Sequence, residues 1–237
     1  MNLNKIKNVE IVYQPKVALV TKEFNSFEAL IRFFDQNNNM LNTEDVIMLL
    51  KNINDMRNIT NKVIDRTISV MENLENYKNL SFSINISCAE IEDDFFEEWI
   101  ENLFFKYEKK YLRRLEFEIT EKYKIKNSKL FEKRLKILKN KGFLISLDDI
   151  GTGFNNYELM YKYEFDYIKI DKSLIKEINL NKGLIKNIIE NAHKLNRKVI
   201  AEGIEDESTY RFLKELGCDL GQGFFFYKPK KISEFNI

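Results

Sequence analysis

The sequence has few of the residues that stabilise small secreted proteins or that separate domains. Its 237 residues include two cysteines, two prolines, eight glycines and one histidine. Cys88 and Cys218 are too few for a disulfide framework, and such low cysteine usage fits a reducing compartment. No linker rich in proline, glycine or serine interrupts the chain, so we expect a single domain over residues 1–237.

The chain also lacks an excess of charge of one sign and any long hydrophobic run. Its 38 basic and 37 acidic residues leave a formal net charge of +1, so no overall field favours polymeric nucleic acid or an anionic membrane. The first eight residues contain no apolar segment of signal-peptide length, and no later segment approaches the length of a membrane span. These absences predict a cytoplasmic protein that binds neither membrane nor polymeric nucleic acid.

Strand-like and helix-like segments alternate along the whole chain. Apolar residues recur at helical spacing between Met56 and Leu74, which indicates an amphipathic helix. Polar and apolar side chains alternate in Leu80–Ser87 and again in Arg114–Glu121, as in half-buried strands. About eight such strand–helix units in one domain favour a closed α/β barrel of the TIM (β/α)8 type over an open sheet.

Local signals predict where three of these segments begin or end. Pro15 cannot donate to a sheet ladder, so Ile11–Val20 is predicted to be an edge strand or the start of the sheet. One helix is expected from about Glu90 to Phe105. Gly142 follows a helical pattern and is expected to end that helix in a left-handed conformation.

The segment Phe143–Phe154 joins an apolar strand to two adjacent carboxylates and a glycine-containing turn. Asp148 and Asp149 follow the strand, and their like charges repel each other unless cations or hydrogen-bond donors compensate. Taken alone, the pair can also be a capping pair at a strand-to-helix turn. The pair alone therefore does not indicate a functional site, and the residues that lie near it in the fold decide between the two interpretations.

Further polar residues stand within or at the end of other strand-like segments: Glu28, Asn85, Glu118, Lys169, Glu202 and Gln222. In a barrel, the carboxyl ends of the strands converge on one mouth whatever their separation in sequence. We therefore expect these side chains to meet Asp148 and Asp149 in one pocket.

The residue types in this pocket indicate divalent metal chemistry. Carboxylate and amide oxygens, without sulfur or imidazole, are the ligands of Mg²⁺ or Mn²⁺ rather than of zinc or copper, and the only histidine, His193, is predicted on a helix surface. The number of acids exceeds what one octahedral cation takes, so two metal ions fit the set. Such a pair activates water and stabilises the leaving oxygen of a phosphodiester. Lys169 can add positive charge near the reacting atoms, or can simply pair with an acid in a structural role.

A set of eight short motifs resembles the EAL-domain family, in the family's order and at compatible spacings: Tyr13–Pro15, Phe27–Arg32, Asn85–Ser87, Glu116–Glu121, Asp148–Gly153, Lys169–Asp171, Ala201–Glu205 and Gln222–Gly223. No single motif is specific, but together they cover about residues 10 to 230. The resemblance implies a modified barrel whose first strand runs antiparallel. It also implies hydrolysis of the bacterial second messenger cyclic di-GMP to linear pGpG.

The resemblance assigns a metal site and a catalytic group. It implies that one Mg²⁺ or Mn²⁺ is held by Glu28, Asn85, Glu118 and Asp148, with Asp148 and Asp149 reaching a second ion. Glu202 resembles a general base or second-metal ligand, and Lys169 resembles the residue that orients the water. Glu205 resembles an acid that contacts the metal through water or from just outside its ligands.

The resemblance also assigns one residue that anchors a loop and four residues that would line the substrate. Glu121 resembles the glutamate that anchors the loop after Asp149. The positions that would line the dinucleotide are Gln14, Leu30, Arg32 and Gln222. Arg32 suits a phosphate because of its forked donors, whereas the two glutamines can also just satisfy backbone groups.

The chain departs from the family pattern at three places, and the departures near Asn85 and at Ile150 leave an alternative open. Members commonly continue the Asn85 motif with Pro-Arg-Gln, whereas this chain reads Ser87-Cys-Ala-Glu90, so one basic contact to the ligand is absent. Ile150 replaces a usual phenylalanine, and Asp206 replaces a frequent threonine. No presumed metal ligand is lost, which favours an active phosphodiesterase. The alternative is a non-catalytic cyclic di-GMP receptor or protein-interaction module. The family often dimerises through the helix after the paired aspartates, which predicts a homodimer contact near residues 155–163.

Overall fold

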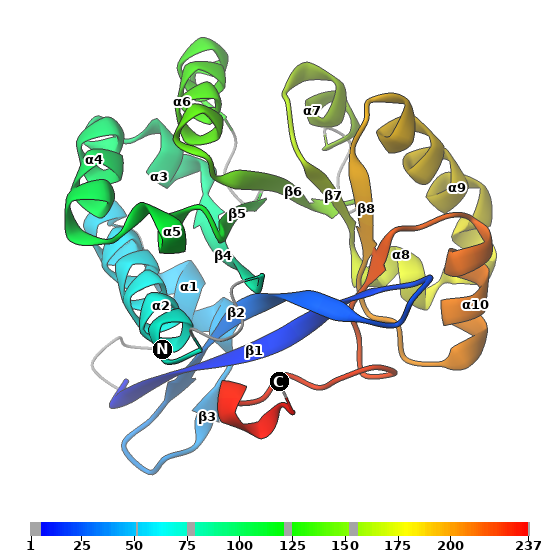
Figure 1. Cartoon of the computed structure of the whole chain (residues 1–237), viewed down its shortest axis with the longest axis horizontal. Helices are drawn as coiled ribbons and strands as arrows, with labels where there is room; N and C mark the ends of the chain where they lie inside the picture. The colour runs from blue at the N-terminus through cyan, green and yellow to red at the C-terminus, as the bar shows by residue number, and fades with distance from the viewer. Residues whose placement is uncertain (1–5, 51, 75–78, 121–124, 152–155, 237) are drawn as a thin grey trace.

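The computed structural model describes residues 6–50, 52–74, 79–120, 125–151 and 156–236. Within these ranges the chain forms a mixed sheet surrounded by helices (Figure 1). The strands are β1 (Asn8–Ala18), β2 (Phe24–Phe34), β3 (Met40–Leu41), β4 (Ser81–Ser87), β5 (Leu115–Thr120), β6 (Leu144–Ile150), β7 (Tyr167–Ile170), β8 (Lys198–Ala201) and β9 (Leu220–Gly221).

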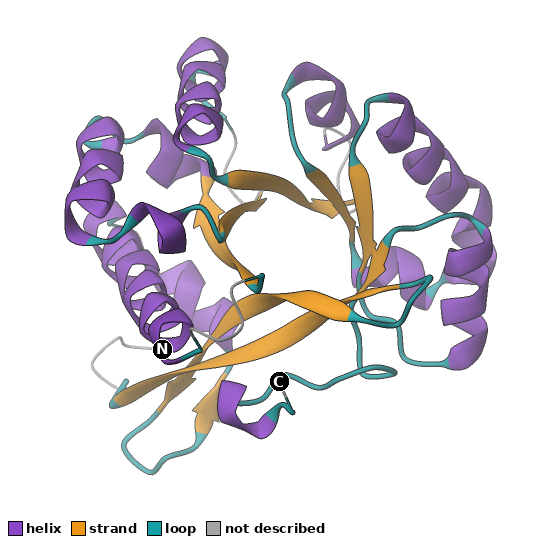
Figure 2. Ribbon diagram, in the orientation of Figure 1, coloured by secondary structure: helices purple, strands orange, loops and turns teal. Residues whose placement is uncertain are grey.

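The helices cover the outside of the strand ring (Figure 2). They are α1 (Thr43–Leu49), α2 (Ile53–Asn73), α3 (Cys88–Glu92), α4 (Phe96–Lys106), α5 (Lys109–Leu112), α6 (Ser128–Lys141), α7 (Asn156–Lys162), α8 (Lys172–Lys176), α9 (Ile178–Lys194), α10 (Glu207–Glu215) and the 3₁₀ helix η2 (Ile232–Glu234). None of the described helices is long and apolar enough to cross a membrane.

The strand order β1-β9-β8-β7-β6-β5-β4-β2-β3 is closed by a direct pairing of β1 with β2. Eight strands therefore form a barrel, and β3 extends β2 outside it. β1 runs antiparallel to both β2 and β9, whereas the neighbours from β2 through β4 to β9 are parallel. This arrangement confirms the predicted modified barrel with an antiparallel first strand.

The prediction of an edge position for β1 is wrong, because β1 is the strand that closes the barrel. It pairs with β2 along its length and with β9 at Val17 and Ala18. Pro15 lies between the Val17–Gly221 pair and an isolated bridge from Tyr13 to Lys230. On that side of the strand the proline has no ladder partner in the described chain, so its missing N–H removes no hydrogen bond.

The helix expected from about Glu90 to Phe105 is divided in two. Asp93 adopts an extended conformation at the end of α3, and its side chain accepts a hydrogen bond from the backbone N–H of Phe95. Such side-chain-to-backbone bonds compete with continued helix. The predicted helix end at Gly142 is confirmed, since this residue has φ 94° after α6.

Apolar side chains fill the space between the barrel and its helices. Phe27 stacks on Phe82, and Phe117 packs against both Trp99 and Phe143. The barrel interior is different, because it contains buried charged side chains, among them Lys16 and the glutamates of β5. A buried charge is costly unless an opposite charge pairs with it. This requirement governs how charged side chains are arranged at the carboxyl ends of the strands.

Candidate active site at the carboxyl ends of the strands

A cavity of about 720 Å³ opens at the carboxyl ends of the parallel strands. Most of the residues singled out from the sequence line it: Gln14, Glu28, Leu30, Arg32, Asn85, Asp148, Asp149, Lys169, Glu202, Glu205 and Gln222. Glu118 is fully buried directly below, where it contacts Lys169. Glu121 lies outside the described residues.

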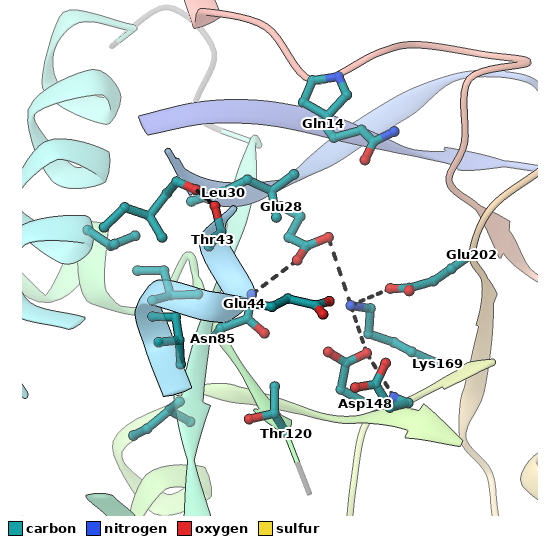
Figure 3. Close-up of a pocket in the computed structure, with 18 of the residues that line it drawn as sticks. Gln14, Glu28, Leu30, Thr43, Glu44, Asn85, Thr120, Asp148, Lys169 and Glu202 are labelled. Carbon is teal, nitrogen blue, oxygen red and sulfur yellow. Dashed lines mark hydrogen bonds and ion pairs between the residues drawn. The ribbon is translucent and has the colours of Figure 1, made fainter. Parts of the chain in front are cut away.

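Lys169 occupies the centre of the acidic group (Figure 3). Its Nζ lies 2.5 Å from Glu118 Oε2 and 2.6 Å from Glu202 Oε1. The same nitrogen lies 3.0 Å from Asp148 Oδ1 and 3.9 Å from Glu28 Oε2. One ammonium group from β7 thus meets four carboxylates that come from four other parts of the barrel. These contacts raise the pKa of Lys169, although burial alone would lower it.

Glu118 lies between two ammonium groups. Lys16 Nζ is 2.7 Å from Glu118 Oε1, whereas Lys169 contacts the other oxygen, Oε2. Burial by itself would raise the pKa of Glu118, but the charges of Lys16 and Lys169 outweigh it and lower the pKa to about 2. Glu118 is therefore ionised at neutral pH and offers a fixed negative charge.

The remaining acids of the pocket are less well compensated. Burial raises the pKa of Glu28, Asp148 and Glu202, and repulsion from neighbouring carboxylates adds to the rise. Within the described chain, the central ion-pair network links five carboxylates to two ammonium groups: Glu28, Glu116, Glu118, Asp148 and Glu202 against Lys16 and Lys169. Bound cations would remove this excess of negative charge.

A bulge explains why both adjacent aspartates face the cavity. In a regular strand, successive side chains point to opposite faces. The pairing of β6 with β7 is irregular between Leu147 and Ile150, and Asp149 has φ 58°. Oxygen atoms of Asp148, Asp149 and Glu202 consequently lie within 4.8 Å of one another. Such a group of hard oxygen donors fits a divalent cation such as Mg²⁺ or Mn²⁺.

A second oxygen-rich position is formed by Glu28 and Asn85. Asn85 stands opposite Glu118 on the neighbouring strand, which turns the two side chains to the same side. The amide nitrogen of Asn85 donates to Glu28 Oε1 at 3.1 Å. This bond leaves the carbonyl oxygen of Asn85 directed away from Glu28, where it can serve as a metal ligand together with the carboxylates.

The wall of the cavity beside the acids is partly apolar. Leu30 and Arg32 belong to β2, and further lining side chains come from α1, from Leu50 at its C-terminal cap and from α2: Ile47, Met48, Leu50, Met56, Ile59 and Val63. Arg32 is half-buried, and burial lowers the pKa of its guanidinium. One of its nitrogens donates to the carbonyl oxygen of Ile31 at 2.9 Å. A wall of this kind suits a ligand that has a flat, largely apolar part next to an anionic group.

Glu205 and the two glutamines lie differently from the central acids. Glu205 is exposed on the cavity wall and is not part of the carboxylate group defined by Asp149 and Glu202. Gln14 and Gln222 are both almost completely buried. Their amide groups are hydrogen-bonded to each other and, through Gln222, to Glu28.

The departures from the family pattern have structural roles in this chain. Ser87 and Glu90 form a capping box at the start of α3, and Glu90 is buried against the hydroxyl of Thr60. Asp206 caps α10 by accepting a hydrogen bond from the backbone N–H of Thr209 at 2.9 Å. Ile150 is fully buried in the core. These substitutions therefore stabilise local structure while leaving the acidic group unchanged.

Lys16 and Ser146 are among the residues near the site that were not singled out as site residues from the sequence. Lys16 is buried in the barrel interior and pairs with both Glu116 and Glu118. Ser146 also donates a hydrogen bond to Glu116. The signal for Lys16 is its position two residues after Gln14, because period-two alternation turns both to the same face of a strand.

A barrel with carboxylates and a lysine gathered at the carboxyl ends of its strands has the architecture typical of TIM-barrel active sites. The chain belongs to the EAL domain family, whose model matches residues 2–229. It is 29% identical over 224 residues to a cyclic di-GMP phosphodiesterase of Pseudomonas aeruginosa. That match covers 92% of this chain but only 38% of the relative, so this chain spans well under half of that protein.

Solved structures show the same fold. An EAL domain protein from Listeria monocytogenes is 26% identical with a TM-score of 0.84, over 95% of this chain and 90% of that chain. A second structure, of an EAL enzyme in its cAMP- and cyclic-di-GMP-bound form, is 27% identical with a TM-score of 0.86. This second match covers 97% of this chain and 64% of that chain.

Proposed function

We propose that this chain hydrolyses cyclic di-GMP to linear pGpG with the help of bound Mg²⁺ or Mn²⁺. The observation that carries the proposal is the imbalance of the central network, in which five carboxylates face two ammonium groups. Membership of the EAL domain family and the named activity of the relative from Pseudomonas aeruginosa support the substrate.

The oxygen donors fit two cation positions. Glu28, Asn85, Glu118 and Asp148 would hold one ion, and Asp148 with Asp149 would reach the second. When bound, divalent ions supply positive charge that stabilises the phosphodiester oxygens and lowers the pKa of water. This charge also relieves the repulsion among the buried carboxylates.

The protein side chains then carry the proton transfer and orientation. Attack of a water oxygen on phosphorus breaks the bond between phosphorus and the 3′ oxygen. The phosphate stays on the 5′ oxygen of the other nucleoside, and the released 3′ oxygen takes up a proton to become a hydroxyl. Glu202, whose pKa is raised by burial, is suited to accept the proton of the attacking water. Lys169, 2.6 Å from Glu202, orients the water and stabilises developing negative charge. Glu205 contributes from the cavity wall through water.

The β2 wall supplies substrate contacts. Arg32 would bind a phosphate through its forked donors, and Leu30 would pack against a base. The cavity of about 720 Å³ lies within the range of about 300–1,000 Å³ typical of small-molecule sites.

The test is hydrolysis of cyclic di-GMP by the purified chain, followed by chromatography during titration with Mg²⁺ and Mn²⁺. We expect pGpG to appear only with metal, and Glu28→Ala to abolish turnover. Tight binding of the dinucleotide without turnover at any metal concentration would instead indicate the alternative, a non-catalytic receptor on the same fold. That alternative is motivated by the departures near Asn85, where Ala89 offers no basic side chain on α3, and at Ile150.

We also propose that the chain forms a homodimer through α7 and its neighbours. Tyr161 on α7 is 54% exposed, and a large exposed aromatic side chain is common at protein interfaces. Light scattering of the purified chain would give a dimer mass, and Tyr161→Glu would shift it to a monomer mass. A monomer mass for the unaltered chain at high concentration would reject the proposal.

A further inference from the structure

Two glutamine side chains connect a backbone carbonyl to a carboxylate of the acidic group. Gln14 Nε2 donates to the carbonyl oxygen of Tyr227 at 2.9 Å. Gln222 Nε2 donates to Gln14 Oε1 at 2.9 Å and to Glu28 Oε2 at 2.8 Å. The result is a relay of hydrogen bonds from Tyr227 to Glu28, and we call these three bonds the amide relay.

The direction of the amide relay is fixed by its two ends. The carbonyl of Tyr227 and the carboxylate of Glu28 can only accept hydrogen bonds. An amide NH₂ group has two hydrogens, and Gln222 uses one for Gln14 and the other for Glu28. A flipped Gln222 would turn its own acceptor toward two other acceptors. Both glutamine orientations are therefore determined by their partners.

The amide relay holds Glu28 with neutral groups. Glu28 Oε2 accepts from Gln222, and Glu28 Oε1 accepts from Asn85 at 3.1 Å. Lys169 stays 3.9 Å from Glu28, compared with 2.5 Å from Glu118. Neutral donors fix the orientation of a carboxylate while leaving its charge available to a cation.

Gln222 has no donor hydrogen left for a substrate, and its Oε1, buried without a hydrogen-bond partner among the described residues, can only accept. Gln14 is 8% exposed and Gln222 is 4% exposed. A phosphodiester offers oxygen acceptors, yet both amide hydrogens of Gln222 are already engaged. A hydrogen bond from Gln222 to a phosphate would require release of Glu28 or of Gln14.

We propose that Gln222, supported by Gln14, is a positioning residue that orients Glu28 for cation binding and does not donate a hydrogen bond to a phosphate of the dinucleotide. The proposal rests on the proposed function only in that the acidic group takes a divalent ion. It assigns the two glutamines a role different from the substrate contact that the family resemblance implies.

The test is Mn²⁺ binding to the metal-free full chain, measured from the electron paramagnetic resonance signal of free Mn²⁺. Gln222→Met removes both donor hydrogens at similar side-chain size. We expect Mn²⁺ binding about 10–100-fold weaker, the range observed when the supporting partners of metal ligands are removed. Gln14→Met leaves the bond to Glu28 in place and is expected to weaken binding less. Gln36→Met, at an exposed position outside the cavity, is the matched control and should bind Mn²⁺ normally.

Kinetics separate the two roles of Gln222. A positioning role predicts that hydrolysis by Gln222→Met recovers at high Mn²⁺ with an unchanged KM for cyclic di-GMP. Normal Mn²⁺ affinity in Gln222→Met together with a raised KM would overturn the inference. If Gln222→Met does not fold, as judged by thermal unfolding, Gln14→Met becomes the deciding variant, and normal Mn²⁺ affinity in it overturns the inference.

The two proposals fail in different ways. An unaltered chain that binds Mn²⁺ but never hydrolyses cyclic di-GMP contradicts the proposed function and leaves the amide relay testable. If the unaltered chain is active and both glutamine variants keep normal Mn²⁺ affinity, only the positioning role of the glutamines is contradicted.

Discussion

The ammonium group of Lys16 lies 2.7 Å from Oε1 of Glu118 inside the barrel, and neither side chain is more than 1% exposed. Lys16 also pairs with Glu116 at 2.9 Å. The strand that closes the barrel therefore supplies the cation that balances the floor of the acidic pocket. Burial of these charges is tolerable only because each has a partner.

Replacing Lys16 should destabilise the fold. Lys16→Met leaves Glu116 without that cation and Glu118 with only one of its two, so we expect a loss of about 3–5 kcal/mol in the free energy of unfolding. Urea denaturation of the variant and of the unaltered chain measures this difference in the free energy of unfolding. The control is Lys133→Met, which breaks an exposed pair with Glu97 and should cost less than about 1 kcal/mol. Equal effects of the two substitutions would show that the buried network is not a source of stability.

Replacing Glu202 should affect turnover much more than folding. Glu202→Gln keeps the shape of the side chain but cannot accept a proton, so we expect kcat to fall by about 10²–10⁴-fold. Steady-state hydrolysis of cyclic di-GMP measures it, with Glu207→Gln on the exposed surface of α10 as the control. A kcat within a few-fold of the unaltered chain would exclude Glu202 as the base.

Two glycines should respond in opposite ways to alanine. Gly151 has φ 109°, and an added Cβ would overlap Leu174 Cδ1, so Gly151→Ala should destabilise the protein by more than about 1 kcal/mol. Gly183 lies within α9 with no atom within 4 Å of an added Cβ. Gly183→Ala should therefore stabilise the protein by about 0.5–1 kcal/mol. Thermal unfolding of both variants tests this, and the same sign for both would contradict it.

The cap at Asp206 should contribute to stability in a pH-dependent way. Hydrogen bonds from Ser208 and Thr209 hold the pKa of Asp206 below its usual 3.8. The charged cap therefore stabilises the folded state above the unfolded pKa, and this contribution is lost as pH falls through the lower folded pKa. We expect Asp206→Ala to cost about 0.5–2 kcal/mol at neutral pH, with Asp206→Thr costing less and hydrolysis unchanged in both. Loss of activity in Asp206→Ala with normal stability would argue against a purely structural role.

Part of the site could be read from the sequence because it depends on short-range patterns. Period-two alternation indicated the face of β5 that carries Glu116 and Glu118. The position of Asp148 after an apolar strand indicated a strand end. The family resemblance added the antiparallel first strand, which the pairing of β1 with β2 and β9 confirms.

Other features depend on contacts between distant parts of the chain. Pro15 alone suggested an edge strand. β1 instead closes the barrel, and the proline is tolerated there because it lies between two positions at which β1 pairs with other segments. The direction of the Gln14 and Gln222 amides follows from the fixed acceptors at Tyr227 and Glu28.

The sequence by itself therefore indicated the alternation of strands and helices and which acids stand at strand ends, because alternation and strand ends are local properties. Only the tertiary structure decided how charge is shared among those acids. Lys16 and Lys169 come from strands far apart in the sequence, and barrel closure brings both to Glu118. Electrostatic energy depends on distance in space, so this balance is a property of the folded barrel.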